Sequence, residues 1–408
     1  MTFGIEKGVY TLSLGMEATL AWAIILLLIG RWLVQRVYVL QRFCIPAPVV
    51  GGLLFSLLTL FLHQTGLMAV KMTTTFQTPL MLGFFTTIGL IASLKLVKKG
   101  GKILFFYWLL CSILALMQNI IGVSLAEVLD IHPLLGVLMG AVSMEGGHGA
   151  AGAFGPEVEA MGIYGATAVA MAAATFGLVS GGLIGGPIAN YLIKKENLTS
   201  TELDENPDAV TEEAVEGTHM TASLFMQHAA VITVCMTVGL WVATTLKASL
   251  AIALPSYVGA MFFAVVVRNL NDHFHWMNLD NSIINFIGEI CLGIFLSMAL
   301  MTLRLWELAD LALPMIIVLA AQVLFMVFYT VVIAFRVLGK TYDAAIICAG
   351  MAGHGLGATP NAIANMTAVT ERFGPSTKAF LVVPLCGAFL IDLFGIPCIT
   401  WFINYFAP

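Results

Sequence analysis

Charge is scarce in this sequence. Of its 408 residues only 10% are Asp, Glu, Lys or Arg, whereas 60% are hydrophobic. Ordinary soluble domains carry about 25% charged and roughly 45–50% apolar residues, so the composition excludes a soluble globular chain. Lys and Arg number 18 against 23 acids, and without a basic excess no nucleic-acid partner is expected. The composition predicts a protein whose main partner is the lipid bilayer.

Several signatures of other protein classes are missing as well. Seven cysteines occur, but none forms a CxxC pair and all except Cys44 lie in apolar runs, which is typical of core side chains. The chain start has no basic stretch, and no small-residue cleavage site follows the first apolar run, so that run is expected to remain. GxSxG and HExxH motifs are absent, which argues against an enzyme. No metal centre is expected, because His, Cys and acidic residues nowhere stand at ligand spacing.

What is present is a succession of apolar runs. Crossing a bilayer of about 30 Å takes roughly 20 helical residues. Runs of about this length are centred near 18–34, 46–62, 78–94, 103–126 and 165–192, then 223–245, 254–270, 284–302, 312–335 and 378–403. The segment 194–221 between these two sets contains eight acids and no apolar period, so we expect a solvated linker. It divides the chain into halves at residues 1–193 and 222–408.

The two halves resemble each other. LKLVKKGG at 94–101 corresponds to LRLWELAD at 303–310, IPAPVVGGLLF at 45–55 to LPSYVGAMFF at 254–263, and GGHG at 146–149 to AGHG at 352–355. Five crossings per half turn the second half upside down relative to the first, as in many secondary transporters. We therefore predict an all-α polytopic membrane protein with two inverted-topology repeats of five transmembrane helices.

Basic residues predict the orientation of these helices. With the N-terminus outside, only Lys7, Lys71, Lys247 and Arg304 of the 18 Lys and Arg fall outside the cytoplasm. Cytoplasmic loops are enriched in Lys and Arg, so this arrangement is preferred over the reverse. Both termini are then periplasmic and the central linker is cytoplasmic.

Each half also contains one interrupted segment, at 132–162 and 341–375. Non-helical backbone at membrane depth is tolerated only where protein or a water-filled cavity supplies hydrogen-bond partners, so we expect two re-entrant loops that line a cavity. In the first loop the helix should restart from Ala150 onward, at latest at Pro156. In the second, Thr359 should be the N-cap and Pro360 the first helical residue. Each restart aims a helix N-terminus at the cavity, where an anionic group can bind.

Asp392 lies near the middle of the last apolar run, where a charge costs about 2.5–3.5 kcal/mol on insertion scales. It should therefore face either a functional cavity or an ion-pair partner. Glu145, directly before the first glycine pair, is a similar candidate. His148 and His354 are more often core histidines than metal ligands. The polar positions Gln118, Asn119 and Gln322 are expected to form hydrogen bonds between helices.

Long blocks of this chain resemble the bacterial sodium/glutamate symporter family. They include PLMLGFFTTIGL at 79–90, MQN at 117–119, GGHG at 146–149, ATFGLVSGGLIGGP at 174–187, GLGATPNAIANM at 355–366 and FLVVPLCGAFLID at 380–392. The resemblance implies an inner-membrane homodimer that takes up L-glutamate with sodium by an elevator-type motion. It also implies that residues 146–149 and 355–361 form the substrate and ion loops. Glu145 and Ala150 stand where the family pattern often has serine and threonine.

These arguments yield two sets of candidate residues. The candidate substrate-binding residues are Gly146, Gly147, His148, Gly149, Gly355, Gly357, Thr359, Asn361 and Asp392. The candidate sodium-binding residues are Glu145, Gly353, Asn365 and Asp392. Asp392 can pair with the substrate ammonium or coordinate sodium, and the sequence does not choose. No cofactor is expected beyond sodium as the coupling ion. The alternative function is a sodium- or proton-coupled carrier of another organic anion, such as a di- or tricarboxylate.

Overall fold

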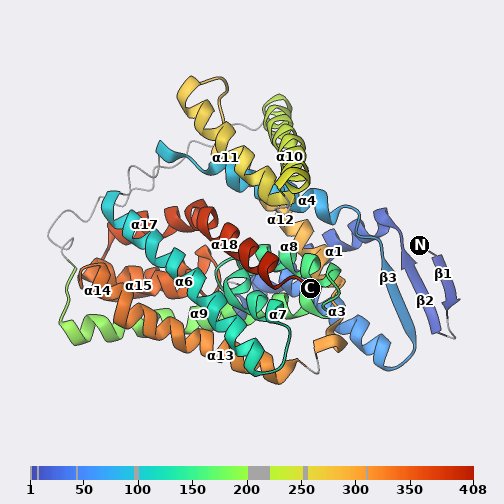
Figure 1. Ribbon diagram of the computed structural model, residues 1–408, viewed down its shortest axis with the longest axis horizontal. Coiled ribbons are helices and arrows are strands. Elements are labelled where there is room, and N and C mark those ends of the chain that lie inside the picture. Colours follow the sequence, from blue (N-terminus) through green and yellow to red (C-terminus); the bar gives the residue numbers. More distant parts are fainter. Residues whose placement is uncertain are drawn as a thin grey trace.

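The computed structural model describes residues 2–6, 9–42, 45–95, 101–200, 221–250, 256–308 and 311–408. Cys44, Lys7 and residues 201–220 of the acidic linker lie outside the described residues. Helices occur at all ten predicted apolar runs (Figure 1). Within the described residues, seven helices are long and apolar enough to cross a membrane. The protein is therefore a multi-pass membrane protein built mainly of helices.

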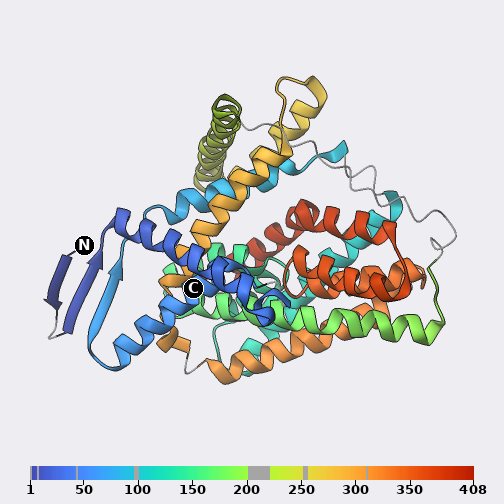
Figure 2. The same cartoon turned by 180° about the vertical axis from the view of Figure 1, so that it is seen from behind.

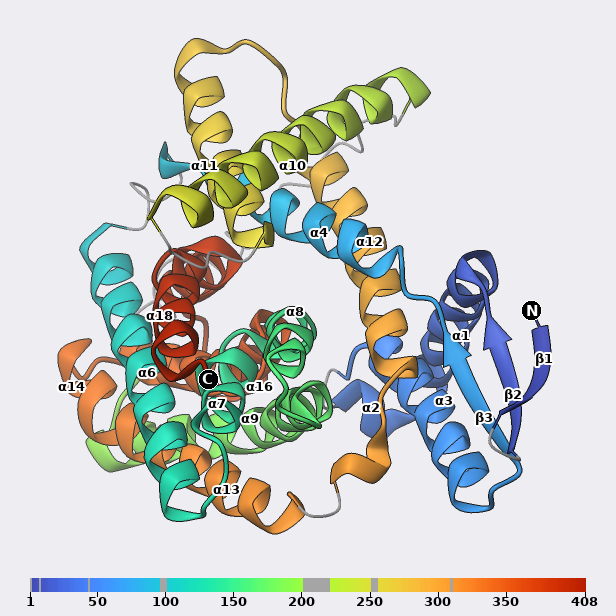
Figure 3. The same cartoon turned by 45° about the vertical axis from the view of Figure 1, so that its right-hand side comes forward.

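The helices pack into two groups, which lie on different sides of the molecule in Figure 3. The six-helix bundle comprises α1 (Met16–Arg36), α3 (Ala47–Gln64), α4 (Gln77–Ile91), α10 (Ala222–Leu250), α11 (Ser256–Phe274) and α12 (Asn281–Met301). The loop-bearing bundle comprises α6 (Gly101–Val128), α7 (Pro133–Val137), α8 (Gly147–Ala160), α9 (Ala166–Glu196), α13 (Ala312–Phe328), α14 (Phe335–Val337), α15 (Tyr342–His354), α16 (Thr359–Phe373), α17 (Thr377–Leu385) and α18 (Ile391–Phe406). Figure 2 shows α9 and α13 side by side along one edge of the second group.

Small residues allow the helices of the six-helix bundle to approach closely. A side chain at Gly51 of α3 would collide with the carbonyl oxygen of Leu26 in α1. At the corresponding place in the second half, a side chain at Gly259 of α11 would meet the carbonyl oxygen of Gly239 in α10. Such contacts are a common way of joining helices in lipid, where no hydrophobic force drives helices together. Both halves therefore build their first helix pair on the same kind of contact.

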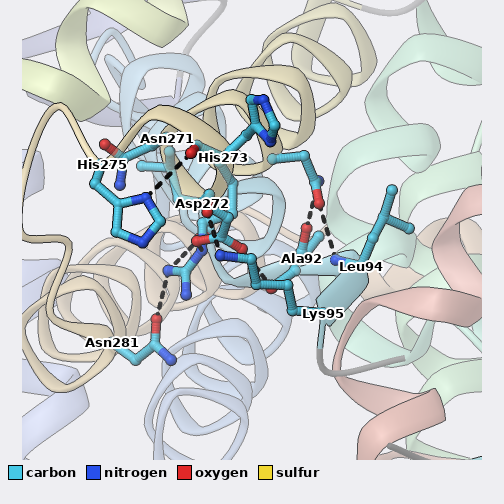
Figure 4. Close-up of polar contacts among 12 residues, drawn as sticks. Ala92, Leu94, Lys95, Asn271, Asp272, His273, His275 and Asn281 are labelled. Carbon is cyan, nitrogen blue, oxygen red and sulfur yellow. Dashed lines mark hydrogen bonds and ion pairs between the residues drawn. The ribbon is translucent and has the colours of Figure 1, made fainter. Parts of the chain in front are cut away.

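Buried polar groups tie the ends of α4 and α11 together (Figure 4). The Arg268 guanidinium forms an ion pair with Asp272 at 3.1 Å and donates hydrogen bonds to Leu90 O at 3.1 Å and Asn281 Oδ1 at 2.7 Å. The Asn269 amide donates to Ala92 O at 2.9 Å. The last carbonyl groups of a helix lack partners within that helix, and these side chains satisfy them at the end of α4.

Three strands lie beside the start of α1 and the end of α3, where the sequence predicted no regular structure. β1 (Thr2–Glu6) pairs antiparallel with β2 (Val9–Leu14), and β2 pairs parallel with β3 (Met68–Met72) in the register Tyr10↔Met68 to Leu14↔Met72. The all-α prediction is wrong for these residues. The parallel partner of a strand must lie far away in sequence. The local sequence of β2 or β3 therefore does not predict their pairing.

Several helices in the loop-bearing bundle are interrupted by π-helical turns at Leu138–Val142 (η1), Tyr329–Ala334 (η4) and Cys386–Leu390 (η5). The predicted last span, 378–403, is thus α17 and α18 joined through η5. Turns of this kind often occur at functional sites. Asp392 follows η5 directly, at the start of α18.

Candidate substrate and sodium site

Both interrupted segments consist of a helix, a break and a second helix. In the first, the backbone leaves helical geometry at Gly140 (φ −92°, ψ −136°), and α8 begins at Gly147. In the second, α15 ends at His354 and α16 begins at Thr359. The second break lies in the predicted glycine segment, whereas the first begins at Gly140, before the predicted Gly146 and Gly147.

The two restarts differ in detail from the prediction. The first comes at Gly147, earlier than the predicted Ala150 to Pro156, and Pro156 lies inside α8. In the second, Ala358 has the extended backbone of an N-cap, so the prediction that Thr359 is the N-cap is wrong. Thr359 is already helical, and its hydroxyl donates to Gly387 O at 3.2 Å. The Thr359 hydroxyl is therefore used for tertiary packing against η5.

The breaks of the two halves touch each other. Gly147 has φ +55°, in the left-handed region that favours glycine. A Cβ atom at this position would lie 2.7 Å from Gly357 O, closer than real Cβ contacts allow. Two segments about two hundred residues apart in sequence thus meet at a point where Gly147 leaves no room for a side chain.

A cavity of about 710 Å³ opens between the two bundles at this point. Its wall on the loop-bearing bundle includes the N-terminal turns of α8 and α16, together with Asp392 of α18. Its wall on the six-helix bundle is mostly apolar, with Arg31 and Glu289 as charged exceptions. That wall contains Leu27, Leu28, Phe84, Phe85, Ile88, Phe286, Ile290, Leu292 and Leu296. A polar face therefore lies opposite an apolar one.

Most of the predicted site residues line this cavity: Glu145, Gly146, Gly147, His148, Gly149, Gly357, Thr359 and Asp392. Four do not: Gly353, Gly355, Asn361 and Asn365. The Asn361 amide donates to Leu178 O at 2.6 Å, and the Asn365 amide donates to Gly181 O at 3.0 Å. These two side chains thus hold α16 against α9, behind the cavity wall.

Of the three carboxyl groups that line the cavity, Glu289 is exposed, and Glu145 and Asp392 belong to the loop-bearing bundle, where the described residues provide neither with an ion-pair partner. Glu145 is 8% exposed, and neither of its carboxyl oxygens has a hydrogen-bond partner within the described chain. No ion pair between Asp392 and a described basic residue occurs. Burial of a carboxyl group without partners is costly, so both groups are suited to receive a cation.

Both histidines are buried but also line the cavity, and His354 Nδ1 has no hydrogen-bond partner within the described chain. His148 Nε2 lies 2.9 Å from Thr175 Oγ1 of α9, and His354 is 3% exposed. Among the described residues, no group of three or more His, Cys, Asp or Glu side chains is arranged to hold a metal ion. Six cysteines are free thiols.

Polar side chains of α6 hold both breaks, as predicted for Gln118 and Asn119. Asn119 Oδ1 accepts from Ala141 N at 2.9 Å, next to the break at Gly140. The Gln118 amide donates to Gly355 O at 2.7 Å in the second break. Trp108, which the sequence did not single out, donates to Leu390 O at 2.8 Å just before Asp392. Arg31, in the C-terminal part of α1, and Glu289, near the middle of α12, also line the cavity and were not among the predicted site residues.

A second cavity, of about 790 Å³, lies at the other end of α8. Glu159 and Thr167 line it from the loop-bearing bundle, and Lys71 and Arg304 from the other side. Between the two cavities α8 packs tightly on α12, since a Cβ atom at Gly152 would lie 2.8 Å from the Phe295 ring. The two cavities thus open at different ends of one packed contact.

Comparison with known proteins agrees with this architecture. The family model for the sodium/glutamate symporter matches residues 12–375. The sodium/glutamate symporter of Escherichia coli (strain K12) is 44% identical over 379 residues, covering 92% of this chain and 94% of that protein. The sodium/glutamate symporter of Haemophilus influenzae is 44% identical over 380 residues, with the same coverage. Matches of this length and identity establish that the chain belongs to the sodium/glutamate symporter family.

Proposed function

We propose that this protein imports L-glutamate together with sodium across the bacterial inner membrane. The observation that carries the proposal is the cavity in which the N-terminal turns of α8 and α16 meet Asp392. A helix N-terminus carries about half a positive charge and open N–H donors. Two such ends suit the two carboxylates of glutamate, and one carboxylate suits its ammonium group or a sodium ion.

The residues have distinct roles in this proposal. Gly146, Gly147, Gly149 and Gly357 offer backbone groups to the substrate, and a side chain at Gly146 or Gly147 would collide with neighbouring protein atoms. Glu145 is a candidate sodium ligand because neither of its oxygens has a hydrogen-bond partner among the residues that the structure describes. Gly353, Gly355, Asn361 and Asn365 act from behind the wall, where they hold the second break in shape.

The proposed mechanism is alternating access by two inverted repeats, each with a re-entrant loop. The matching glycine contacts of the first helix pairs support the repeats. With the N-terminus periplasmic, Arg31 near the end of α1 supports a mouth of the substrate cavity on the cytoplasmic side. The second cavity, with Lys71 and Arg304, is then periplasmic. An elevator-type motion of the loop-bearing bundle would slide its polar wall along the apolar face of the other bundle. The functional unit is proposed to be a homodimer.

Sodium coupling is the central test of this function. In proteoliposomes, uptake of labelled glutamate should require an inward sodium gradient and show counterflow, which separates a carrier from a channel. Glutamate carries a net charge of −1, so import with two sodium ions moves one positive charge. Each 100 mV, inside negative, then contributes about 2.3 kcal/mol, or roughly 40-fold in accumulation. Equal uptake driven by a proton gradient without sodium would favour the alternative carrier of another organic anion.

Thiol accessibility tests the two cavities. In a protein whose native cysteines are replaced, Ala150→Cys lies on the substrate cavity wall and Thr74→Cys lines the second cavity. An impermeant thiol reagent should label the first from the cytoplasm and the second from the periplasm, and sodium with glutamate should slow labelling at Ala150→Cys. Labelling of both positions from the same face under all substrate conditions would contradict alternating access between these cavities.

A further inference from the structure

The tip of the second break fits between two helices from different halves of the chain. A Cβ atom at Gly355 would lie 2.6 Å from the side chains of both Leu114 in α6 and Met326 in α13. Gln118 lies one turn after Leu114 in α6, and Gln322 lies one turn before Met326 in α13; both are fully buried. The loop tip is thus enclosed by two apolar and two amide side chains, on the side away from the substrate cavity.

The two glutamines form a short chain of hydrogen bonds. The Gln322 amide donates to Gln118 O at 2.8 Å, and the Gln118 amide donates to Gly355 O at 2.7 Å. Each Nε2 group therefore has a partner. The side-chain oxygens do not, since neither Gln118 Oε1 nor Gln322 Oε1 has a hydrogen-bond partner within the described chain, although both atoms are buried.

Buried acceptors without donors are costly, and two of them near one loop tip need a common explanation. Both are carbonyl-type oxygens, which are ligands of hard cations. Helix α15 also ends here, so the negative end of its dipole points at the same place. In transporters with broken helices, unwound carbonyl groups and helix C-terminal ends coordinate sodium.

We propose that Gln118 Oε1, Gln322 Oε1 and the carbonyl oxygen of Gly355 bind a coupling sodium ion behind the second break. The proposal rests on sodium-coupled transport as the function, and it adds a site separate from Glu145 and Asp392. Because the next residues, Gly357 to Thr359, form part of the substrate cavity wall, an ion at Gly355 orders the loop that receives substrate. The site thereby explains how a dehydrated sodium ion favours glutamate binding.

The experiment compares Gln118→Met and Gln322→Met with the parent and with Gln227→Met, which replaces an exposed glutamine of α10. Reversal potentials give the number of sodium ions per glutamate, and sodium-dependent thermal stabilisation without glutamate reports ion binding directly. Each core variant should lose one sodium ion per glutamate, or raise the sodium concentration for half-maximal stabilisation by at least about tenfold. Gln227→Met should match the parent. An unchanged stoichiometry and sodium dependence in both core variants would overturn the site.

If the Met variants do not fold, Gln322→Glu decides the question. The glutamate side chain keeps an oxygen at this position and adds a negative charge. If residue 322 coordinates sodium, the variant should need a lower sodium concentration than the parent for half-maximal stabilisation. If Gln322 only holds the loop in shape, this sodium concentration should stay the same or rise in the variant. Either of these results would overturn the proposal. A parent protein that transports without sodium would instead refute the proposed function, whatever the variants show.

Discussion

Replacing Asp392 by asparagine is expected to abolish concentrative glutamate uptake. The side chain lines the substrate cavity beside two helix N-termini, which suit carboxylates but leave the ammonium group and the sodium ion without an anionic partner. Loss of one member of a buried ion pair costs about 3–5 kcal/mol. This corresponds to a loss of at least about 100-fold in affinity. The protein should remain folded in detergent, as size-exclusion chromatography can show.

The two candidate roles of Asp392 differ in glutamate binding. If it pairs with the ammonium group, Asp392→Asn weakens glutamate binding even at saturating sodium. If it coordinates sodium, a higher sodium concentration partly restores binding. Glu371→Gln, at an exposed position of α16, is the matched control and should transport like the parent. Transport by Asp392→Asn at the parent rate with the same sodium dependence would move the anionic site to Glu145.

Gly147→Ala should be nearly as damaging, although it adds only a methyl group. The backbone at Gly147 has φ +55°, and the new Cβ atom would lie 2.7 Å from Gly357 O. A side chain in this backbone region costs about 1–3 kcal/mol, and here the neighbour is backbone of the other break. We expect uptake to fall at least about tenfold, since small misplacements in a binding site cost up to about 100-fold. The thermal unfolding temperature should also fall.

Gly186→Ala provides the control for this substitution. Gly186 lies within α9, and no atom is within 4 Å of the place where its Cβ atom would be. Alanine is favoured over glycine inside a helix by roughly 0.5–1 kcal/mol, so this variant should be as stable as the parent or slightly more stable. Equal transport by Gly147→Ala and Gly186→Ala would show that the contact between the two breaks is unimportant for transport.

Local patterns were sufficient to predict most of the helices and both breaks. Each apolar run is long enough to predict its own helix, and glycines such as Gly146 and Gly147 weaken a helix wherever they occur. The failures have tertiary causes. Local propensity favours Thr359 over Ala358 as an N-cap, and only packing against Gly387 assigned the Thr359 hydroxyl elsewhere. Strands β2 and β3 are each too short to be predicted from their own residues, because the sheet forms only when the two segments pair.

The membrane location, the helical runs and the glycine breaks were determined by the sequence alone, because they depend on hydrophobicity and backbone freedom over a few tens of residues. Which residues meet was decided only by the tertiary structure. The contact between Gly147 and Gly357, the position of Asn361 behind the cavity wall and the unpartnered oxygen of Gln322 all depend on segments far apart in sequence. Such contacts form only when the two halves pack together, and neither half contains the information by itself.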